Sequence, residues 1–441
     1  MKTNRIATRT CAWHAMAVGL AFASSVVATN AHAQPTLPEP PPPVEPWYEA
    51  LDFGLFADAY FGFNANTPKP QEDGNLFRAY DATNGFALSW VGADVSYDPR
   101  PVGGTVSLRF GPSAETYADS CFSSETRCDG DIVGLDIVKQ AFASWRPVPG
   151  LTFDLGKFDT IYGAEVAESQ DNLNYSRGAV YWLAQPLFHT GLRANLRVLP
   201  EFDLNALIVN GWNNSIDNNI GKTWGLQGVV RPWPELSLAL GWLGGPEQDD
   251  AVSLDCPADS AYSPVTGTCV SARGVPADSY IVDRGGANEL ESWRHLADVV
   301  VTWEPTGALS LVFNADFGVE GVRTLDSEGD TNVDSMSYFG TMLGSRLALT
   351  DVWALAARAE YFSDPDGYAT GFEDLKLVTG TLTVEASPTP NLQLRLEGRG
   401  DFAVDANVDV SDDEKADIFP AGVRDDTPTQ ITATLSAVVR I

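Results

Sequence analysis

Apolar and polar residues alternate along the C-terminal segment 431–441. One face carries Ile431, Ala433, Leu435, Ala437, Val439 and Ile441, and the other carries Thr432, Thr434, Ser436 and Arg440. Successive side chains of a β-strand point to opposite faces, so this segment has one wholly apolar face and one polar face. Such a strand suits a wall with hydrocarbon outside and water inside.

The same alternation recurs along the whole chain. It marks the segments 53–63, 86–97, 105–110, 132–146, 151–158, 191–199, 202–212, 223–232, 236–243, 295–304, 308–317, 337–349, 352–362, 374–386, 392–402 and 430–441. We therefore predict an all-β fold, a transmembrane antiparallel up-and-down β-barrel of about 16 strands.

The connections between these segments alternate between short and long. Tight turns such as 200–201 and 350–351 follow one end of the strands, and long polar loops such as 244–294 and 403–429 follow the other. Short periplasmic turns and long extracellular loops, with both termini on the short-turn side, are typical of bacterial outer-membrane barrels. A soluble β-sandwich also alternates, but it does not explain why all the long loops gather on one rim.

Aromatic residues cluster at the predicted strand ends. Trp145, Trp233, Trp303 and Trp353 lie near short turns, and Phe61, Phe158, Trp212, Trp242 and Phe402 lie near long loops. Amphipathic rings prefer the two membrane interfaces. The clustering predicts two aromatic belts.

The N-terminus resembles an export signal. Lys2, Arg5 and Arg9 precede an apolar run, and Ala31-His32-Ala33 forms a cleavage site. The competing interpretation is a membrane anchor, but the run is shorter than the roughly 17 residues that a spanning helix needs. We predict a signal peptide at 1–33, a proline-rich periplasmic tether at 34–50 and the barrel at 51–441.

Composition narrows the function classes. The formal net charge is −31, which argues against nucleic-acid binding because a phosphate backbone requires a basic face. The mean hydropathy of −0.10 is too polar for a bundle of membrane helices. A barrel can be this polar because only alternate residues meet lipid.

The four cysteines beyond the signal segment fall in two long loops. An exported chain favours disulfides, so the spacing predicts Cys121–Cys128 and Cys256–Cys269 pairs. Metal binding is the alternative interpretation, but the two pairs lie in different loops and have no histidine nearby.

Charged residues at inward positions predict a water-filled lumen. The predicted lumen-facing set is Arg109, Asp136, Asp154, Arg193, Arg197, Arg231, Asp298, Asp316, Arg346, Arg358, Glu360, Arg395, Glu397 and Arg399. A barrel of about 16 strands is wide enough for an aqueous channel, whereas about eight strands would close on their own side chains.

The loop 159–190 carries more apolar residues than an exposed loop usually does. We predict that it folds into the barrel and narrows the pore, with Glu165, Glu168, Asp171 and Arg177 as candidate constriction residues. The alternative is a loop that packs over the barrel mouth or against a neighbouring subunit.

Five short motifs follow one another along the chain: Gly156-Lys157-Phe158, Gly163-Ala164-Glu165, the stretch 174–177, His189-Thr190-Gly191 and Asn210-Gly211-Trp212-Asn213-Asn214. In their order and spacing they resemble the OmpL-like porins, the second β-barrel porin family. The resemblance implies an outer-membrane channel for small polar solutes, placed among lipid and lipopolysaccharide by the barrel-assembly machinery. One departure is Ile441, because such barrels usually end in an aromatic residue.

Other functions have less support in the sequence. A barrel enzyme needs an activated nucleophile, and neither His189 nor His295 has a nucleophile motif nearby. The lengths of the loops also suit an adhesin, and the inward arginines suit a phosphate-type anion porin. The sequence leaves open whether the chain forms a homo-oligomer. We expect no cofactor; calcium could bridge the acidic segments 326–334 and 405–417, but neither has EF-hand spacing. Because acids outnumber bases in the long loops by roughly three to one, we expect a mild cation preference.

Overall fold

The computed structural model describes residues 47–441 except for 69–73, 79, 83, 118–136, 218, 249–251, 254–259, 264–267, 272–280, 283–288, 326–330, 408–417 and 422–426. The predicted signal peptide and most of the tether lie outside the described residues. So do Asp136, Cys121, Cys128 and Cys256, while Cys269 is described in its backbone only.

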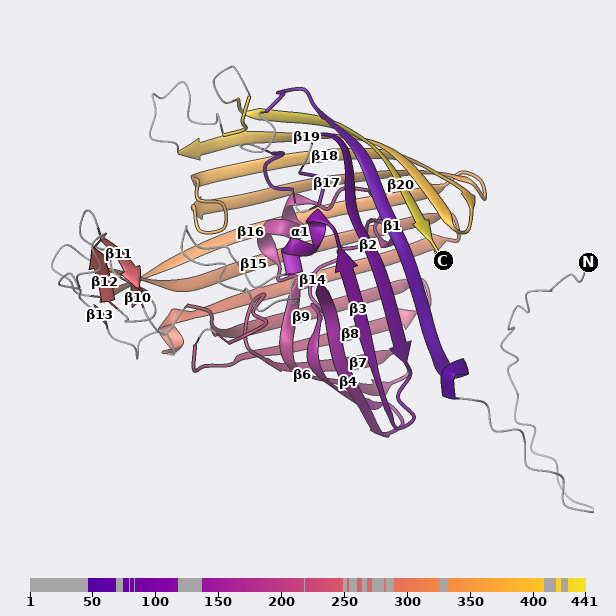
Figure 1. Ribbon diagram of the computed structural model, residues 1–441, viewed down its shortest axis with the longest axis horizontal. Coiled ribbons are helices and arrows are strands. Elements are labelled where there is room, and N and C mark those ends of the chain that lie inside the picture. Colours follow the sequence, from indigo (N-terminus) through magenta and orange to yellow (C-terminus); the bar gives the residue numbers. More distant parts are fainter. Residues whose placement is uncertain are drawn as a thin grey trace, which may run out of the picture. The chain divides into compact units, whose positions relative to one another are not determined.

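Sixteen antiparallel strands form one closed barrel (Figure 1). They are β1 (Leu51–Asn64), β2 (Gly85–Tyr97), β3 (Val102–Phe110), β4 (Val138–Val148), β5 (Leu151–Asp159), β6 (Phe188–Leu199), β7 (Phe202–Val209), β8 (Thr223–Trp233), β9 (Leu236–Pro246), β14 (Trp293–Thr306), β15 (Leu309–Leu325), β16 (Thr331–Ala348), β17 (Trp353–Asp366), β18 (Glu373–Thr389), β19 (Leu392–Asn407) and β20 (Thr429–Arg440). The first and last strands pair, with Phe61 opposite Leu435, and so close the wall. The predicted fold class is confirmed.

Each predicted segment overlaps one wall strand, but some boundaries were wrong. The prediction extended one strand to Trp212, whereas β7 ends at Val209; β15 and β16 run further towards the long-loop rim than predicted. The segment 244–294, predicted as loop throughout, contains two small two-stranded sheets, β10 (Val252–Ser253) with β13 (Ile281–Val282) and β11 (Ser260–Ser263) with β12 (Thr268–Ser271). Strands this short have too few residues for a readable alternation.

The two faces of the wall differ as the alternation predicts. On β1 the outward Phe53 and Leu55 are 63% and 53% exposed, whereas the inward Asp58 is 0% exposed. Tryptophans at the short-turn ends, Trp145, Trp233, Trp303 and Trp353, are all about half exposed. No helix in the described part of the chain is long and apolar enough to cross a membrane.

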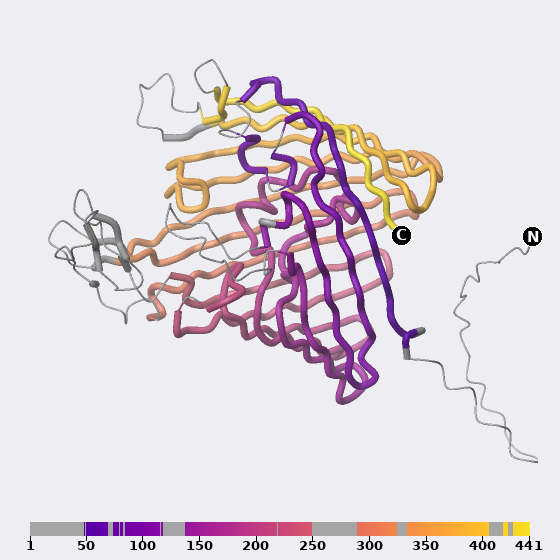
Figure 2. Tube along the Cα trace, in the orientation of Figure 1, coloured from indigo at the N-terminus to yellow at the C-terminus, as the bar shows by residue number. Residues whose placement is uncertain are grey.

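The packed core of the protein lies inside the barrel. Three buried apolar clusters combine inward side chains of the wall with side chains of loops, and one of them joins Phe56 and Trp90 of the wall to Tyr181 of the segment between β5 and β6. That segment includes the short helices η3 (Ser169–Asp171) and α1 (Ala179–Ala184). Figure 2 shows the purple trace of this segment inside the ring of strands.

Two glycines on neighbouring strands lie close to the ends of this segment, one three residues before the end of β5 and the other three residues after the start of β6. Gly156 of β5 and Gly191 of β6 are register partners. A Cβ on Gly156, which has φ +142°, would lie 2.2 Å from the Ala141 oxygen, and one on Gly191 would lie 2.3 Å from the Ile208 oxygen. Glycine is therefore required at both positions, because no side chain fits against the neighbouring strands.

The barrel orientation can be tested by labelling intact cells with a bulky membrane-impermeant maleimide, after replacing the native cysteines with serine. We expect Asp374→Cys on the long-loop rim to be labelled and Pro388→Cys on the short-turn rim to be protected, because only the first faces the medium. Lysed cells should label both, which serves as the control. Labelling in the reverse pattern would overturn the orientation.

Candidate functional site

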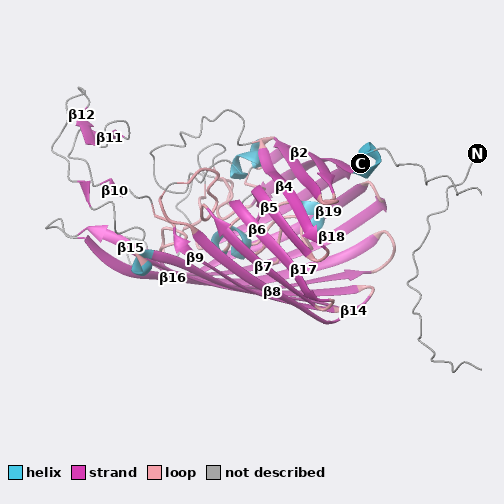
Figure 3. Cartoon of the chain, turned by 90° about the horizontal axis from the view of Figure 1, so that it is seen from below, coloured by secondary structure: helices cyan, strands magenta, loops and turns pink. Residues whose placement is uncertain are grey.

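The candidate site is the barrel interior around residues 160–187, called here the inner loop. This segment connects β5 to β6 and carries η3 and α1, which lie within the ring of strands (Figure 3). It is bound to the wall by polar contacts in several directions.

Glu168 joins the inner loop to β3 and β4. Its carboxylate lies 2.6 Å from the Arg109 guanidinium and 2.7 Å from the Lys139 ammonium. Burial opposes its ionisation, but these two cations outweigh burial and lower the pKa of Glu168 to about 2. Its ordinary value is higher, so the stabilisation is present above about pH 4.5 and is lost as the pH falls towards 2.

Asp58 joins the inner loop to β1. Its two carboxylate oxygens accept hydrogen bonds from the Ser169 hydroxyl at 2.7 Å and the Tyr175 hydroxyl at 3.0 Å. From the neighbouring wall, the Arg395 guanidinium donates to the carbonyl oxygens of Ser169, Asn172 and Asn174. An arginine that binds three carbonyl groups fixes the backbone of this part of the loop.

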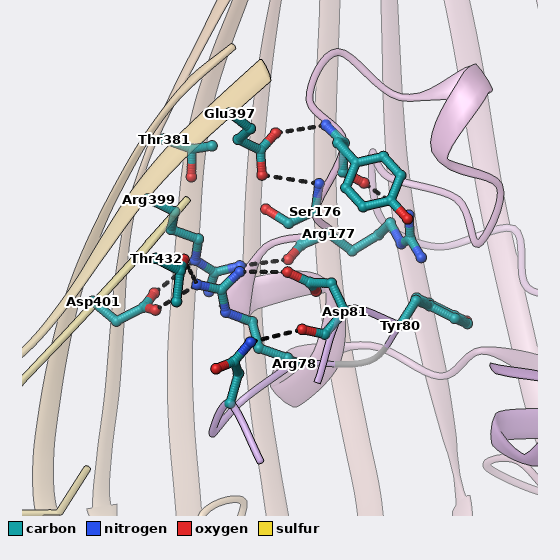
Figure 4. Close-up of polar contacts among 12 residues, drawn as sticks. Arg78, Tyr80, Asp81, Ser176, Arg177, Thr381, Glu397, Arg399, Asp401 and Thr432 are labelled. Carbon is teal, nitrogen blue, oxygen red and sulfur yellow. Dashed lines mark hydrogen bonds and ion pairs between the residues drawn. The ribbon is translucent and has the colours of Figure 1, made fainter. Parts of the chain in front are cut away.

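Glu397 and Glu360 hold the middle of the inner loop. Figure 4 shows Glu397 accepting hydrogen bonds from the backbone N–H groups of Tyr175 (2.7 Å) and Ser176 (3.1 Å). Glu360 accepts one from Val180 at 3.1 Å. These carboxylates satisfy buried backbone donors that would otherwise be costly to leave unpaired.

Arginines pair with the same carboxylates and with the loop. Arg358 lies 2.7 Å from Glu165 of the inner loop and 3.1 Å from Glu360 of its own strand. Arg399 lies 2.7 Å from Asp401 and donates to the Arg177 carbonyl oxygen at 2.7 Å. All of these wall residues are almost fully buried.

The loop between β1 and β2, called here the first loop, reaches the same network (Figure 4). Arg78 lies 2.7 Å from Asp81 and 3.1 Å from Asp401. The Arg177 guanidinium lies 4.0 Å from the centre of the Tyr80 ring, a cation–π contact. The first loop thus packs on the inner loop inside the barrel.

The opposite wall binds the start of the inner loop through amide and carboxylate groups. Asp298 accepts a hydrogen bond from the Gly163 N–H group at 3.1 Å, and Asn314 accepts one from the Ala164 N–H group at 3.1 Å. Gln227 donates to the Ile161 carbonyl oxygen. The loop is therefore attached to strands on all sides of the barrel.

The inward face of the wall is little exposed to solvent around the inner loop. Each of the sixteen strands has at least one inward residue that is at most 5% exposed: Asp58, Trp90, Arg109, Lys139, Phe158, His189, Leu207, Gln227, Leu243, Asp298, Asp316, Met342, Arg358, Thr381, Arg399 and Thr432. The inner loop and the side chains around it thus occupy much of the described interior.

Nearer the short-turn rim, the wall is open to water. Exposed fractions of the inward side chains there are 20% for Arg193, 62% for Arg197, 44% for Arg231, 34% for Arg346 and 55% for Arg440. The carboxylate partners of the first four arginines, Asp154, Asp203 and Glu385, are exposed by 10%, 8% and 4%, whereas Asp171 beside Arg440 is 58% exposed. In this open part of the interior, called here the vestibule, four of the five arginines therefore present more of their charge to water than their carboxylate partners do.

The residues predicted from the sequence fall into two groups. Glu165, Glu168 and Arg177 are enclosed in the network, whereas the side chain of Asp171 is 58% exposed and lies 4.0 Å from Arg440. The described members of the predicted lumen-facing set lie on the inward face. Of these, Arg109, Asp154, Asp298, Asp316, Arg358, Glu360, Arg395, Glu397 and Arg399 are buried, and Arg193, Arg197, Arg231 and Arg346 reach the vestibule.

Some network residues were not predicted. Arg78 and Asp81 lie in the loop between β1 and β2, one of the long loops that the topology predicts to be extracellular, although Phe77 and Tyr80 give the same apolar signal as the inner loop. Lys139 could not be predicted from the alternation because β4 has one extra residue here. Ser107 and Leu108 of β3 pair with Gln140 and Val138, which leaves Lys139 between them. Among described residues, no group of three or more histidine, cysteine, aspartate or glutamate side chains could hold a metal ion. Most of the acidic segments 326–334 and 405–417 lies outside the described residues.

A family model matches residues 50–441, and it is described as "Putative beta-barrel porin-2, OmpL-like". The chain belongs to this family of porins. No curated protein matches the sequence. The family places the protein in the bacterial outer membrane.

Solved outer-membrane proteins share the fold of this porin-family chain at low identity. The outer membrane channel DcaP of Acinetobacter baumannii has a TM-score of 0.52 and 9% identity, over 89% of this chain and 97% of that one. OmpT of Vibrio cholerae, in its trimer form, has a TM-score of 0.50 and 13% identity, over 89% and 99% of the two chains. At these identities the likeness shows the fold alone.

Replacing Glu168 with glutamine should destabilise the porin-family barrel. The change removes the anion from a buried cluster with two cations, a loss worth about 3–5 kcal/mol. Asp171→Asn is the matched control, because Asp171 is exposed and its loss should cost less than about 1 kcal/mol. Urea unfolding in detergent measures both, and equal effects would contradict this assignment of the network.

Proposed function

We propose that small hydrophilic solutes and ions diffuse passively through this barrel along a narrow path that the inner loop controls. The observation that carries the proposal is the inner loop itself, which is bound by hydrogen bonds and ion pairs inside a closed sixteen-strand wall. A barrel of this size holds an aqueous channel unless something fills it. The inner loop occupies the place where the path would be narrowest.

The candidate constriction residues take different roles in this proposal. Glu165, Glu168 and Arg177 anchor the loop, since their charged groups face the wall or the first loop. Asp171 faces water and lines the path. A change in the anchors alters the position of the loop, whereas a change in Asp171 alters only the local charge.

Ion selectivity depends on two competing sets of charges. The acidic outer loops favour cations, whereas the vestibule presents arginines whose carboxylate partners lie beneath them. A charge confined between walls of low dielectric acts more strongly than one at an open mouth. The described geometry therefore favours anions, the alternative to the cation preference expected from the loops.

Further features belong to the same proposal. Residues 1–33 direct export, 34–50 form the tether, and the barrel-assembly machinery inserts the barrel among lipid and lipopolysaccharide. The cysteines pair as Cys121–Cys128 and Cys256–Cys269. One structure with the same fold is described as a trimer, and we propose a homo-oligomer here. Catalysis has no part in the proposal: His189 is buried, hydrogen-bonded to Thr160 and the Gly211 carbonyl oxygen.

Deleting residues 168–182 tests the role of the inner loop. We expect a clear rise in single-channel conductance, because the deletion removes the part of the loop that fills the barrel beside β17 to β20. Planar-bilayer recordings on the purified barrel measure the change, and Asp171→Asn serves as a control that leaves the loop in place. Unchanged conductance in a correctly folded barrel would place the path elsewhere.

Reversal potentials in a salt gradient test the selectivity. We expect anion preference at low salt that weakens as salt rises, because the Debye length falls from about 30 Å at 0.01 M to about 3 Å at 1 M. Replacing both Arg193 and Arg346 with glutamine should reduce the preference. Cation preference at low salt would show instead that the outer loops dominate.

A further inference from the structure

Two arginines of the vestibule share one buried carboxylate. Asp203 of β7 accepts a hydrogen bond from the Arg197 Nε group at 2.9 Å through one oxygen and from an Arg231 Nη group at 2.6 Å through the other. Arg197 and Asp203 are register partners, so the first pair is fixed by the sheet. Arg231 reaches the same carboxylate from β8 on the other side.

This triad carries one excess positive charge, and the excess faces water. Asp203 is 8% exposed, but Arg197 and Arg231 are 62% and 44% exposed. Asp203 contacts Arg197 through Nε, and the terminal nitrogens of that guanidinium donate no hydrogen bond to the carboxylate. The planar fork of a guanidinium binds carboxylate or phosphate oxygens in pairs.

A row of amides lies one step further into the barrel. Asn195 donates to Asn205 at 2.6 Å, Asn205 donates to Gln227 at 3.0 Å, and Gln227 donates to the Ile161 carbonyl oxygen of the inner loop. This row fixes β6, β7 and β8 beside the triad and attaches them to the inner loop. Both arginines are therefore carried by strands of the wall and not by a loop.

We propose that Arg197 and Arg231 form a binding site for a small oxyanion, a carboxylate or phosphate group of a solute, on the vestibule wall. Asp203 positions both arginines and lowers their mutual repulsion. The proposal rests on the proposed function, since the site lies on the path that solutes would take. It adds a definite position to the general preference for anions.

Block of ionic current by malonate tests the site on the purified full-length barrel. Malonate in the vestibule should reduce the single-channel KCl current with a measurable half-blocking concentration. In the Arg197→Gln/Arg231→Gln variant this concentration should rise at least tenfold. In Asp203→Asn it should fall, because the arginines lose their competing anion.

The matched control is Arg100→Gln/Arg146→Gln, which removes the same charge from two exposed arginines that share one carboxylate, Asp98, near the short-turn rim. Its half-blocking concentration should stay within twofold of the wild-type value. Equal weakening in both double variants would show a diffuse field and overturn the site. A conducting wild-type channel that malonate does not block would also overturn the site and leave the porin proposal standing, whereas a barrel that does not conduct would overturn the porin proposal itself.

Discussion

The hydrogen bonding of the backbone in hydrocarbon is the constraint on which the rest of this structure depends. A lipid-facing wall cannot leave N–H or C=O groups unpaired, so its strands must close into a ring. The pairing of β1 with β20 completes that ring. Closure of sixteen strands creates an interior too wide for the wall side chains to fill, and several loops, the inner loop among them, fold inward to occupy it.

Burying loops inside a barrel demands that their polar groups find partners there. The wall supplies those partners as charged side chains. Glu397 and Glu360 accept hydrogen bonds from backbone N–H groups, and Arg395 donates hydrogen bonds to backbone carbonyl groups. The same charges pair with one another, so that buried carboxylates and guanidinium groups are compensated. Where the loops end, unburied arginines remain, and the interior changes from a packed core to a wet vestibule.

The wall could be predicted from the sequence because lipid imposes the same alternation on every strand. The inner loop could be predicted from its apolar residues, which had no reason to face water. The partners of individual charges could not: Arg197 and Arg399 both occupy inward positions, yet one is exposed to water and the other is buried. The difference depends on a loop from a distant part of the chain, as does the contact between Ser176 and Glu397.

The span of those contacts has a consequence for assembly. The inner loop leaves the wall after β5, but its anchors on β17, β18 and β19 lie about 180 to 230 residues later in the chain. Contacts between such distant residues form slowly, because the entropy of closing the intervening chain must be overcome first. The loop therefore reaches its final position only after the last strands have joined the sheet, and a partly assembled barrel has an interior that is still unsealed.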